Sequence, residues 1–82
     1  IAGYVARASL ETDMQRYEAA LYDWEQVSKL DPTNFDYQLS YIDVLIRMGK
    51  NDAARRELDK LVGRGVNQGA VREYYKRLKV KR

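Results

Sequence analysis

The sequence repeats itself at an offset of 34 residues, where segment 18–27 (EAALYDWEQV) aligns without a gap with segment 52–61 (DAARRELDKL). An acidic residue, two alanines, a second acid, a large apolar residue, a third acid and a closing aliphatic residue recur in register. Self-similarity at a fixed period of about 20–50 residues is typical of proteins built from stacked supersecondary units. The chain is therefore expected to contain two copies of one unit that pack against each other.

Apolar residues recur at helical spacing along the chain, and no stretch of any length alternates as a strand would. The expected helices cover residues 1–12, residue 17 to just before Pro32, 35–48, 52–62 and 68–79. The turns between them are short, which favours antiparallel packing of neighbouring helices. Residues with capping or helix-stopping chemistry stand at the boundaries. These residues are Thr33 or Asn34, Gly49, Asn51, Gly63 with Gly65, and Asn67.

The N-terminal part of the chain allows two interpretations. The apolar spacing from Leu10 to Trp24 would permit one unbroken helix. Thr12 followed three residues later by Gln15 has the pattern of a capping box, which indicates the start of a new helix. We adopt the break near Thr12 as the prediction.

Residues 35–48 are expected to form the central helix of the fold, because they carry two apolar faces. One face consists of Phe35, Leu39, Ile42 and Ile46, and the nearly opposite face of Tyr37, Tyr41, Val44 and Met48. A helix with two apolar faces must pack against neighbours on both sides. Between the faces remains one polar stripe, which consists of Asp36, Ser40, Asp43 and Arg47.

The composition argues against several kinds of active site. The chain has no cysteine and no histidine, which removes thiol and histidine catalysis, disulfides, and zinc sites built from these residues. The paired carboxylates Asp36 and Asp43 lie on an exposed stripe rather than in a buried acid–base site. We expect no enzyme activity and no cofactor. No apolar run is long enough to span a membrane, and the compartment stays open, with a soluble, cytoplasmic setting favoured.

The chain resembles the tetratricopeptide repeat. That family places a small alanine early in the second helix of each unit, a bulky residue four positions later and a proline eight beyond that. Ala20, Trp24 and Pro32 match this spacing, and Ala54 and Leu58 match it in the second unit. The sequence departs from the family pattern at Arg7 and Glu11 in the first unit and at Gln38, Asn51 and Val66 in the second.

The resemblance implies an all-α fold of stacked antiparallel helical hairpins that form a short right-handed solenoid. It divides one domain, residues 1–82, into unit one (1–34), unit two (35–66) and a final helix (67–82) that caps the stack or begins a third unit. It implies a non-catalytic module for protein–protein interaction, in which first helices line a concave groove for a peptide or protein. The chain starts at Ile1 rather than methionine and is expected to be an excerpt of a longer protein.

Partner-binding residues are expected along the polar stripe and its borders, because packing requires both apolar faces. The candidates on the central helix are Asp36, Leu39, Asp43, Ile46 and Arg47. A shift by one repeat carries this surface to Ala70, Glu73 and Arg77, and back to Ala2, Val5, Ser9 and Thr12. Some family members clamp a chaperone's C-terminal carboxylate with lysine, asparagine and arginine. Val5 and Ser9 occupy the lysine and asparagine positions, so no such clamp is predicted.

The charge distribution suggests two alternative functions. Residues 63–82 carry seven basic and one acidic side chain, whereas residues 1–34 carry three basic and six acidic ones. The basic residues of segment 74–82 would allow nucleic-acid binding through phosphate contacts. Opposite charges at the two ends, together with fewer than the roughly three repeats that such stacks need, would allow self-assembly through the solenoid ends. A solvated outer face of the last helix is the simpler interpretation of the basic residues.

Overall fold

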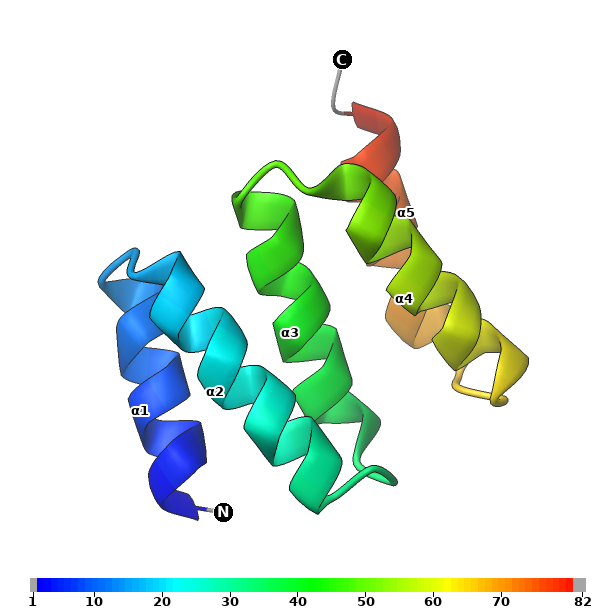
Figure 1. Ribbon diagram of the computed structural model, residues 1–82. Helices are drawn as coiled ribbons and strands as arrows, with labels where there is room; N and C mark the ends of the chain where they lie inside the picture. Colours follow the sequence, from blue (N-terminus) through cyan, green and yellow to red (C-terminus); the bar gives the residue numbers. More distant parts are fainter. Residues whose placement is uncertain (1, 81–82) are drawn as a thin grey trace.

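The computed structural model describes residues 2–80 of the chain, and side chains from residue 2 to residue 78. It contains five helices and, within residues 2–80, no strand (Figure 1). The helices are α1 (Ala2–Asp13), α2 (Tyr17–Leu30), α3 (Phe35–Arg47), α4 (Asn51–Gly63) and α5 (Gln68–Val80). The predicted all-α fold is confirmed. No helix in the described part of the chain is both long and apolar enough to cross a membrane.

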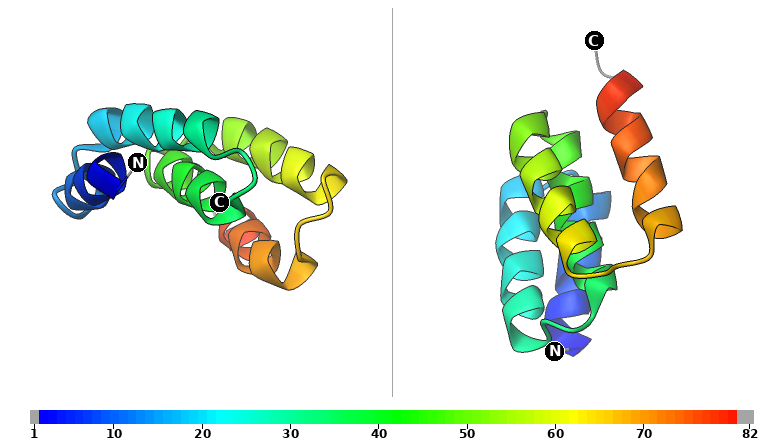
Figure 2. Two further views of the ribbon diagram at one scale, coloured as in Figure 1. Left: turned by 90° about the horizontal axis from the view of Figure 1, so that it is seen from below. Right: turned by 90° about the vertical axis from the view of Figure 1, so that its right-hand side faces the viewer.

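The helices form two layers (Figure 2). α2 and α4 form one layer and run in the same direction, while α1, α3 and α5 form the second layer. Each helix packs against the next one along the chain, and α3 also contacts α5. This is the arrangement of a short tetratricopeptide-like solenoid. We call the surface of α2 and α4 the outer face, and the surface of α1, α3 and α5 that is turned away from them the inner face.

The core consists of two hydrophobic clusters that meet at α3. One cluster joins α3, α4 and α5 around Ile42 and Leu58, which are 1% and 0% exposed. The other joins α1, α2 and α3 around Trp24 and Val44. Tyr41 packs against both clusters. α3 therefore is the central helix, and its two apolar faces serve two different sets of neighbours, as predicted.

The small alanines of the repeat lie where helices cross. Ala20 on α2 and Ala54 on α4 are both fully buried, and so is Ala8 on α1. A methyl side chain lets two helix backbones approach closely, as the packing of ridges into grooves requires. The alanine positions of the two units thus have the same structural role.

Several of the predicted boundary residues act as expected. Asn34 caps α3, because its side chain accepts a hydrogen bond of 3.0 Å from the backbone N–H of Asp36. Asn67 accepts one of 2.7 Å from the backbone N–H of Gly69 at the start of α5. Gly49 follows α3 with φ +79°, the left-handed conformation that terminates many helices.

Two predicted caps are wrong. The chain breaks between α1 and α2 as expected, but Thr12 lies inside the last turn of α1, where its hydroxyl donates to the carbonyl of Ala8 at 2.8 Å. Gln15 instead forms the turn itself, with φ +63°. Asn51 is the first residue of α4 rather than its cap, since the carbonyl of Lys50 already accepts the first helical hydrogen bond.

Candidate protein-interaction face

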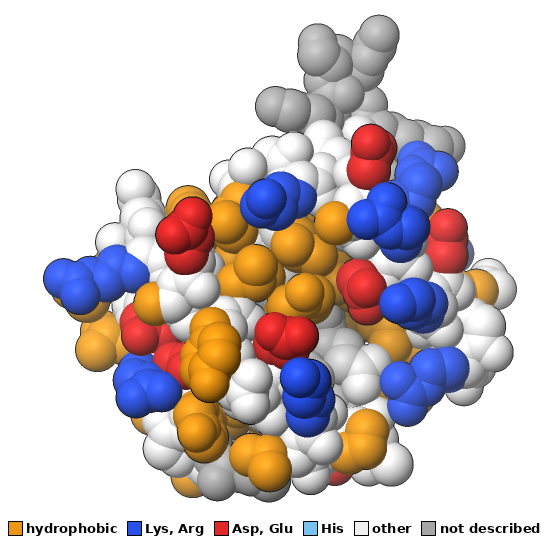
Figure 3. All heavy atoms as spheres, viewed as in Figure 1, with side chains coloured by type: hydrophobic (Ala, Val, Ile, Leu, Met, Phe, Trp, Pro, Cys, Tyr) orange, Lys and Arg blue, Asp and Glu red, His pale blue; other side chains and the backbone are white. Residues whose placement is uncertain are grey.

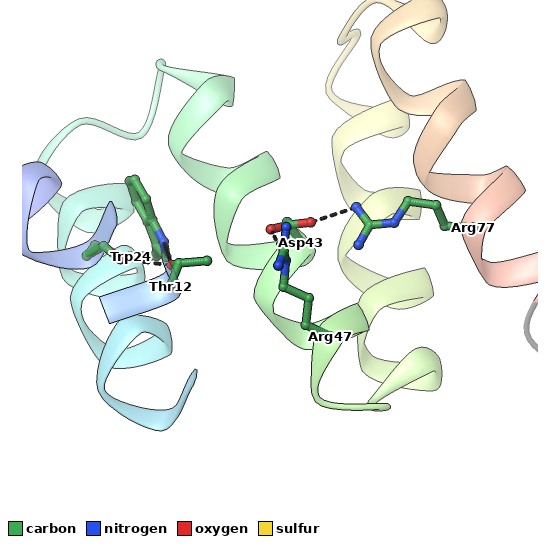
Figure 4. Close-up of polar contacts among 6 residues, drawn as sticks. Thr12, Trp24, Asp43, Arg47 and Arg77 are labelled. Atoms are coloured by element: carbon green, nitrogen blue, oxygen red, sulfur yellow. Dashed lines mark hydrogen bonds and ion pairs between the residues drawn. The ribbon is translucent and has the colours of Figure 1, made fainter. Parts of the chain in front are cut away.

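Asp43 joins two of the predicted partner-binding residues on the inner face (Figure 4). Its carboxylate accepts a hydrogen bond of 2.8 Å from Nε of Arg47, one turn later on α3. The other carboxylate oxygen accepts one of 2.6 Å from Nη1 of Arg77 on α5. The polar stripe of α3 therefore reaches across to α5, which spacing along one helix could not reveal.

The two arginines of this cluster remain accessible. The side chain of Asp43 is 20% exposed, whereas those of Arg47 and Arg77 are 46% and 39% exposed. The hydroxyl of Tyr17 and then the carboxylate of Asp43 raise the pKa of Arg47 above its ordinary value. Two cations thus share one anion, which leaves a positive site with unused N–H donors.

Two hollows flank α3. The first lies between α1 and α3, has a volume of about 230 Å³ and is lined by Ser9, Thr12, Trp24, Ser40 and the Asp43–Arg47 pair, among others. The second lies between α3 and the start of α5, has a volume of about 540 Å³ and includes Asp36, Leu39, Val66 and Ala70. Both hollows are open to solvent.

The remaining predicted site residues are not part of the arginine cluster. Leu39 is only 8% exposed and belongs to the core, although one edge lines the second hollow. Ile46 is partly buried against the same core. Glu73 on α5 forms a long, exposed ion pair of 3.9 Å with Lys76. Asp36 lines the second hollow.

Trp24 was not anticipated near the inner face. Its indole Nε1 donates to the hydroxyl of Thr12 at 3.3 Å, and both residues line the hollow between α1 and α3. The sequence indicated only a core position for Trp24, because its apolar ring follows the stripe of α2. The indole N–H is the signal that could have placed Trp24 next to a polar group, since a buried indole N–H needs a hydrogen-bond acceptor.

Unit one departs from the family pattern at Arg7 and Glu11, and both departures have a common explanation. Arg7 donates two hydrogen bonds of 2.8 Å to the carboxylate of Asp23, which is 2% exposed. This hydrogen-bonded ion pair holds the pKa of Asp23 below its ordinary value. Glu11 lies beside them with one oxygen buried and without a partner among the described residues. Burial, and then the neighbouring Asp23, raise the pKa of Glu11. Polar contacts thus join α1 to α2 where the family uses apolar ones.

The basic C-terminal segment is only partly described. Lys76 pairs with Glu73, and Arg77 pairs with Asp43 while its guanidinium lies 5.7 Å from the ring of Tyr74. The side chains of residues 79–82, on which the nucleic-acid alternative largely depends, lie outside the described residues. The two described basic residues of this segment each have an acidic neighbour within the chain.

Comparison with known proteins identifies the family. A family model described as the tetratricopeptide repeat matches residues 11–79, most of the chain. No curated protein matches the chain, and no solved structure does. The matched residues include the last three residues of α1 and all of α2, α3 and α4. With this match and its stacked helical hairpins, the chain belongs to the tetratricopeptide repeat family.

Proposed function

We propose that the inner face binds a peptide segment of a partner protein, and that an acidic side chain of the peptide meets Arg47 and Arg77. Membership of a family of interaction modules supports a non-catalytic role in protein–protein interaction. The observation that carries the proposal is the sharing of Asp43 by two arginines that are both well exposed.

The chemistry of the cluster favours a carboxylate. Each guanidinium has five N–H donors in a planar fork, and Asp43 occupies one donor of Arg47 and one of Arg77. The remaining donors can bind a carboxylate in two-pronged geometry, which is stronger than a contact between neutral groups. The hydroxyl groups of Ser9 and Ser40, beside the cluster, would hydrogen-bond the peptide backbone.

A displayed library of random peptides tests the proposal. We expect the selected peptides to be enriched in acidic residues and to perturb the amide NMR signals of Ser40, Asp43 and Arg47. Arg47→Gln should weaken binding by at least about tenfold, since a hydrogen bond to a charged group contributes about 1.5–3 kcal/mol. Arg56→Gln, a change of an exposed arginine on α4, is the matched control and should have no effect. Selected peptides without acidic enrichment, or equal losses in both variants, would contradict the proposal.

We further propose that unit one (1–34), unit two (35–66) and the final helix (67–82) form one domain that also associates with a second copy. Exposed apolar side chains on and next to α1 favour this: Leu10 is 58% exposed and Met14 is 52% exposed. Covering exposed apolar groups in an interface removes them from water, which lowers the free energy and favours association. Association at α1 would leave the arginine cluster on α3 and α5 free.

A further inference from the structure

The outer face carries a groove of its own, between α2 and α4. Figure 3 shows hydrophobic side chains gathered between these helices. The groove has a volume of about 370 Å³, and Tyr41, Ile42 and Leu61 contribute its apolar lining. This volume falls within the range of about 300–1,000 Å³ that is usual for ligand sites. We call this site the outer groove.

The charges along the outer groove are ordered. Glu25 on α2 and Glu57 on α4 lie near Tyr41, since both carboxylates, after burial, raise the pKa of its hydroxyl. Further along the same two helices, Lys29, Lys60 and Arg64 line the groove. At a rise of about 1.5 Å per residue, Arg64 lies roughly 10 Å beyond Glu57 along α4. Because α2 and α4 run in the same direction (Figure 1), the acidic residues precede the basic ones on both walls.

The charges of the two walls are only loosely paired within the chain. Lys29 lies 3.8 Å from Glu25, and Lys60 lies 3.4 Å from Glu57. The lysine side chains are 68% and 69% exposed, and exposed pairs of this kind contribute little free energy. These four side chains can therefore exchange their present partners for those of a ligand at low cost.

Two other residues complete the groove. Arg64 donates to the carbonyl of Pro32 at 2.9 Å, which joins the end of α4 to the α2–α3 turn and closes the basic end of the groove. Ser28, on the α2 wall, has a buried hydroxyl oxygen without a hydrogen-bond partner among the described residues. A site with an apolar lining and an ordered set of charges is suited to a ligand of matching pattern.

We propose that the outer groove docks an amphipathic helix of a partner protein that runs antiparallel to α2 and α4. Acidic residues in the first turn of this helix would meet Lys29, Lys60 and Arg64. Basic residues about two turns later would meet Glu25 and Glu57, with apolar side chains between them over Tyr41. Antiparallel docking also places the positive end of the partner's dipole near the negative ends of α2 and α4. Laying an apolar stripe into a groove is a common mode of helix recognition.

Two synthetic helical peptides of identical composition test the charge order. Both carry leucines at positions i, i+3 and i+7, but one has glutamates in the first turn and lysines in the last, and the other has the reverse. We expect the first peptide to bind about tenfold more tightly at low salt, because reversing the order brings like charges together. The difference should shrink at 0.5 M salt, since salt screens exposed charges. Perturbed amide signals should include Ser28, Tyr41 and Leu61.

A fourfold charge exchange on the protein provides the decisive control. The variant Glu25→Lys, Lys29→Glu, Glu57→Lys, Lys60→Glu keeps the composition and changes only side chains at the groove rim. It should reverse the preference between the two peptides, and circular dichroism should verify its helix content. Equal affinity for both peptides, an unreversed preference, or no binding of either peptide would each overturn the proposal. Perturbations confined to Asp43, Arg47 and Arg77 would overturn it too, and would leave the proposed function of the inner face intact.

Discussion

Arg77 on α5 donates a hydrogen bond of 2.6 Å to Asp43 on α3, a residue 34 positions earlier. This separation equals the offset at which the sequence repeats. Residues one repeat apart occupy equivalent places on α3 and α5, and Asp43 and Arg77 therefore face each other across the inner face. The contact shows how a polar stripe on one helix becomes a connection between units.

The Asp43–Arg77 pair should contribute modestly to stability. In a double-mutant cycle of Asp43→Asn and Arg77→Gln, we expect a coupling free energy of about 0.5–1 kcal/mol, the upper part of the range for half-exposed pairs. The coupling should fall at high salt. Urea unfolding measures it. The pair Glu73–Lys76, with side chains 76% and 65% exposed, is the control and should show a coupling near zero. Equal coupling free energies in the two pairs would contradict the closer, less exposed contact of Asp43 with Arg77.

The Glu11→Gln substitution should stabilise the protein at pH 7. The pKa of Glu11 is raised above its ordinary value of 4.5, so the folded state binds its proton more tightly than the unfolded state. The contribution of Glu11 to stability is therefore present below about pH 4.5 and is lost as the pH rises through the folded-state pKa. Glutamine stays neutral and avoids this loss.

The measurement is the free energy of unfolding of both proteins between pH 4 and pH 7. The advantage of Glu11→Gln should be near zero at pH 4 and grow towards pH 7. Glu73→Gln, at an exposed site on α5, is the matched control and should change the free energy of unfolding by no more than about 0.5 kcal/mol. Asp23 acts in the opposite direction, because its lowered pKa makes stability fall below about pH 3.8. An advantage of Glu11→Gln that is independent of pH would show that Glu11 is not protonated preferentially in the fold.

Leu58→Ala should be strongly destabilising. Leu58 is fully buried in the cluster that joins α3, α4 and α5, and truncation of such a leucine costs about 2–5 kcal/mol. Chemical denaturation gives the value. Leu30→Ala is the matched control, since Leu30 is 56% exposed, and should cost less than about 1 kcal/mol. Similar losses in the free energy of unfolding for the two variants would show that Leu58 is not a core residue.

Gly49→Ala should destabilise the turn between α3 and α4. Gly49 has φ +79°, and an L-residue with a side chain pays about 1–2 kcal/mol in this conformation. Gly63 is the control, because an added Cβ there meets nothing within 4 Å and its φ is not positive. Gly63→Ala should be neutral or slightly stabilising. Thermal unfolding distinguishes the two, and an unchanged melting temperature for Gly49→Ala would contradict the turn geometry.

Leu10→Lys should weaken the proposed self-association. A charge at a residue that is 58% exposed should not disturb the monomer fold but would be costly to bury in an interface between copies. Sedimentation equilibrium at tens of micromolar should show a smaller average mass for this variant than for the wild type. Leu30→Lys, also at an exposed leucine, should leave the mass unchanged. A wild-type protein that is purely monomeric would rule out this interface.

The sequence by itself determined the five helices, the central place of α3 and the family. These features depend on local chemistry: apolar residues at helical spacing, the side-chain cap of Asn34 and the left-handed glycine after α3 act within a few residues. The buried alanines at positions 20 and 54 could also be predicted, because the repeat aligns them. The caps at Thr12 and Asn51 were wrong, since a one- or two-residue change in a helix boundary alters which side chain reaches the first turn.

Only the tertiary structure decided which polar side chains meet. Arg7 and Asp23 are 16 residues apart, and they pair because the turn at Gln15 folds α1 back along α2 at a particular angle. The same holds for Asp43 with Arg77 and for the charge order of the outer groove, since each depends on how two helices lie relative to each other. Sequence periodicity indicates the face on which a residue lies. The packing of helices sets the distance between faces, and hydrogen bonds and ion pairs depend on that distance.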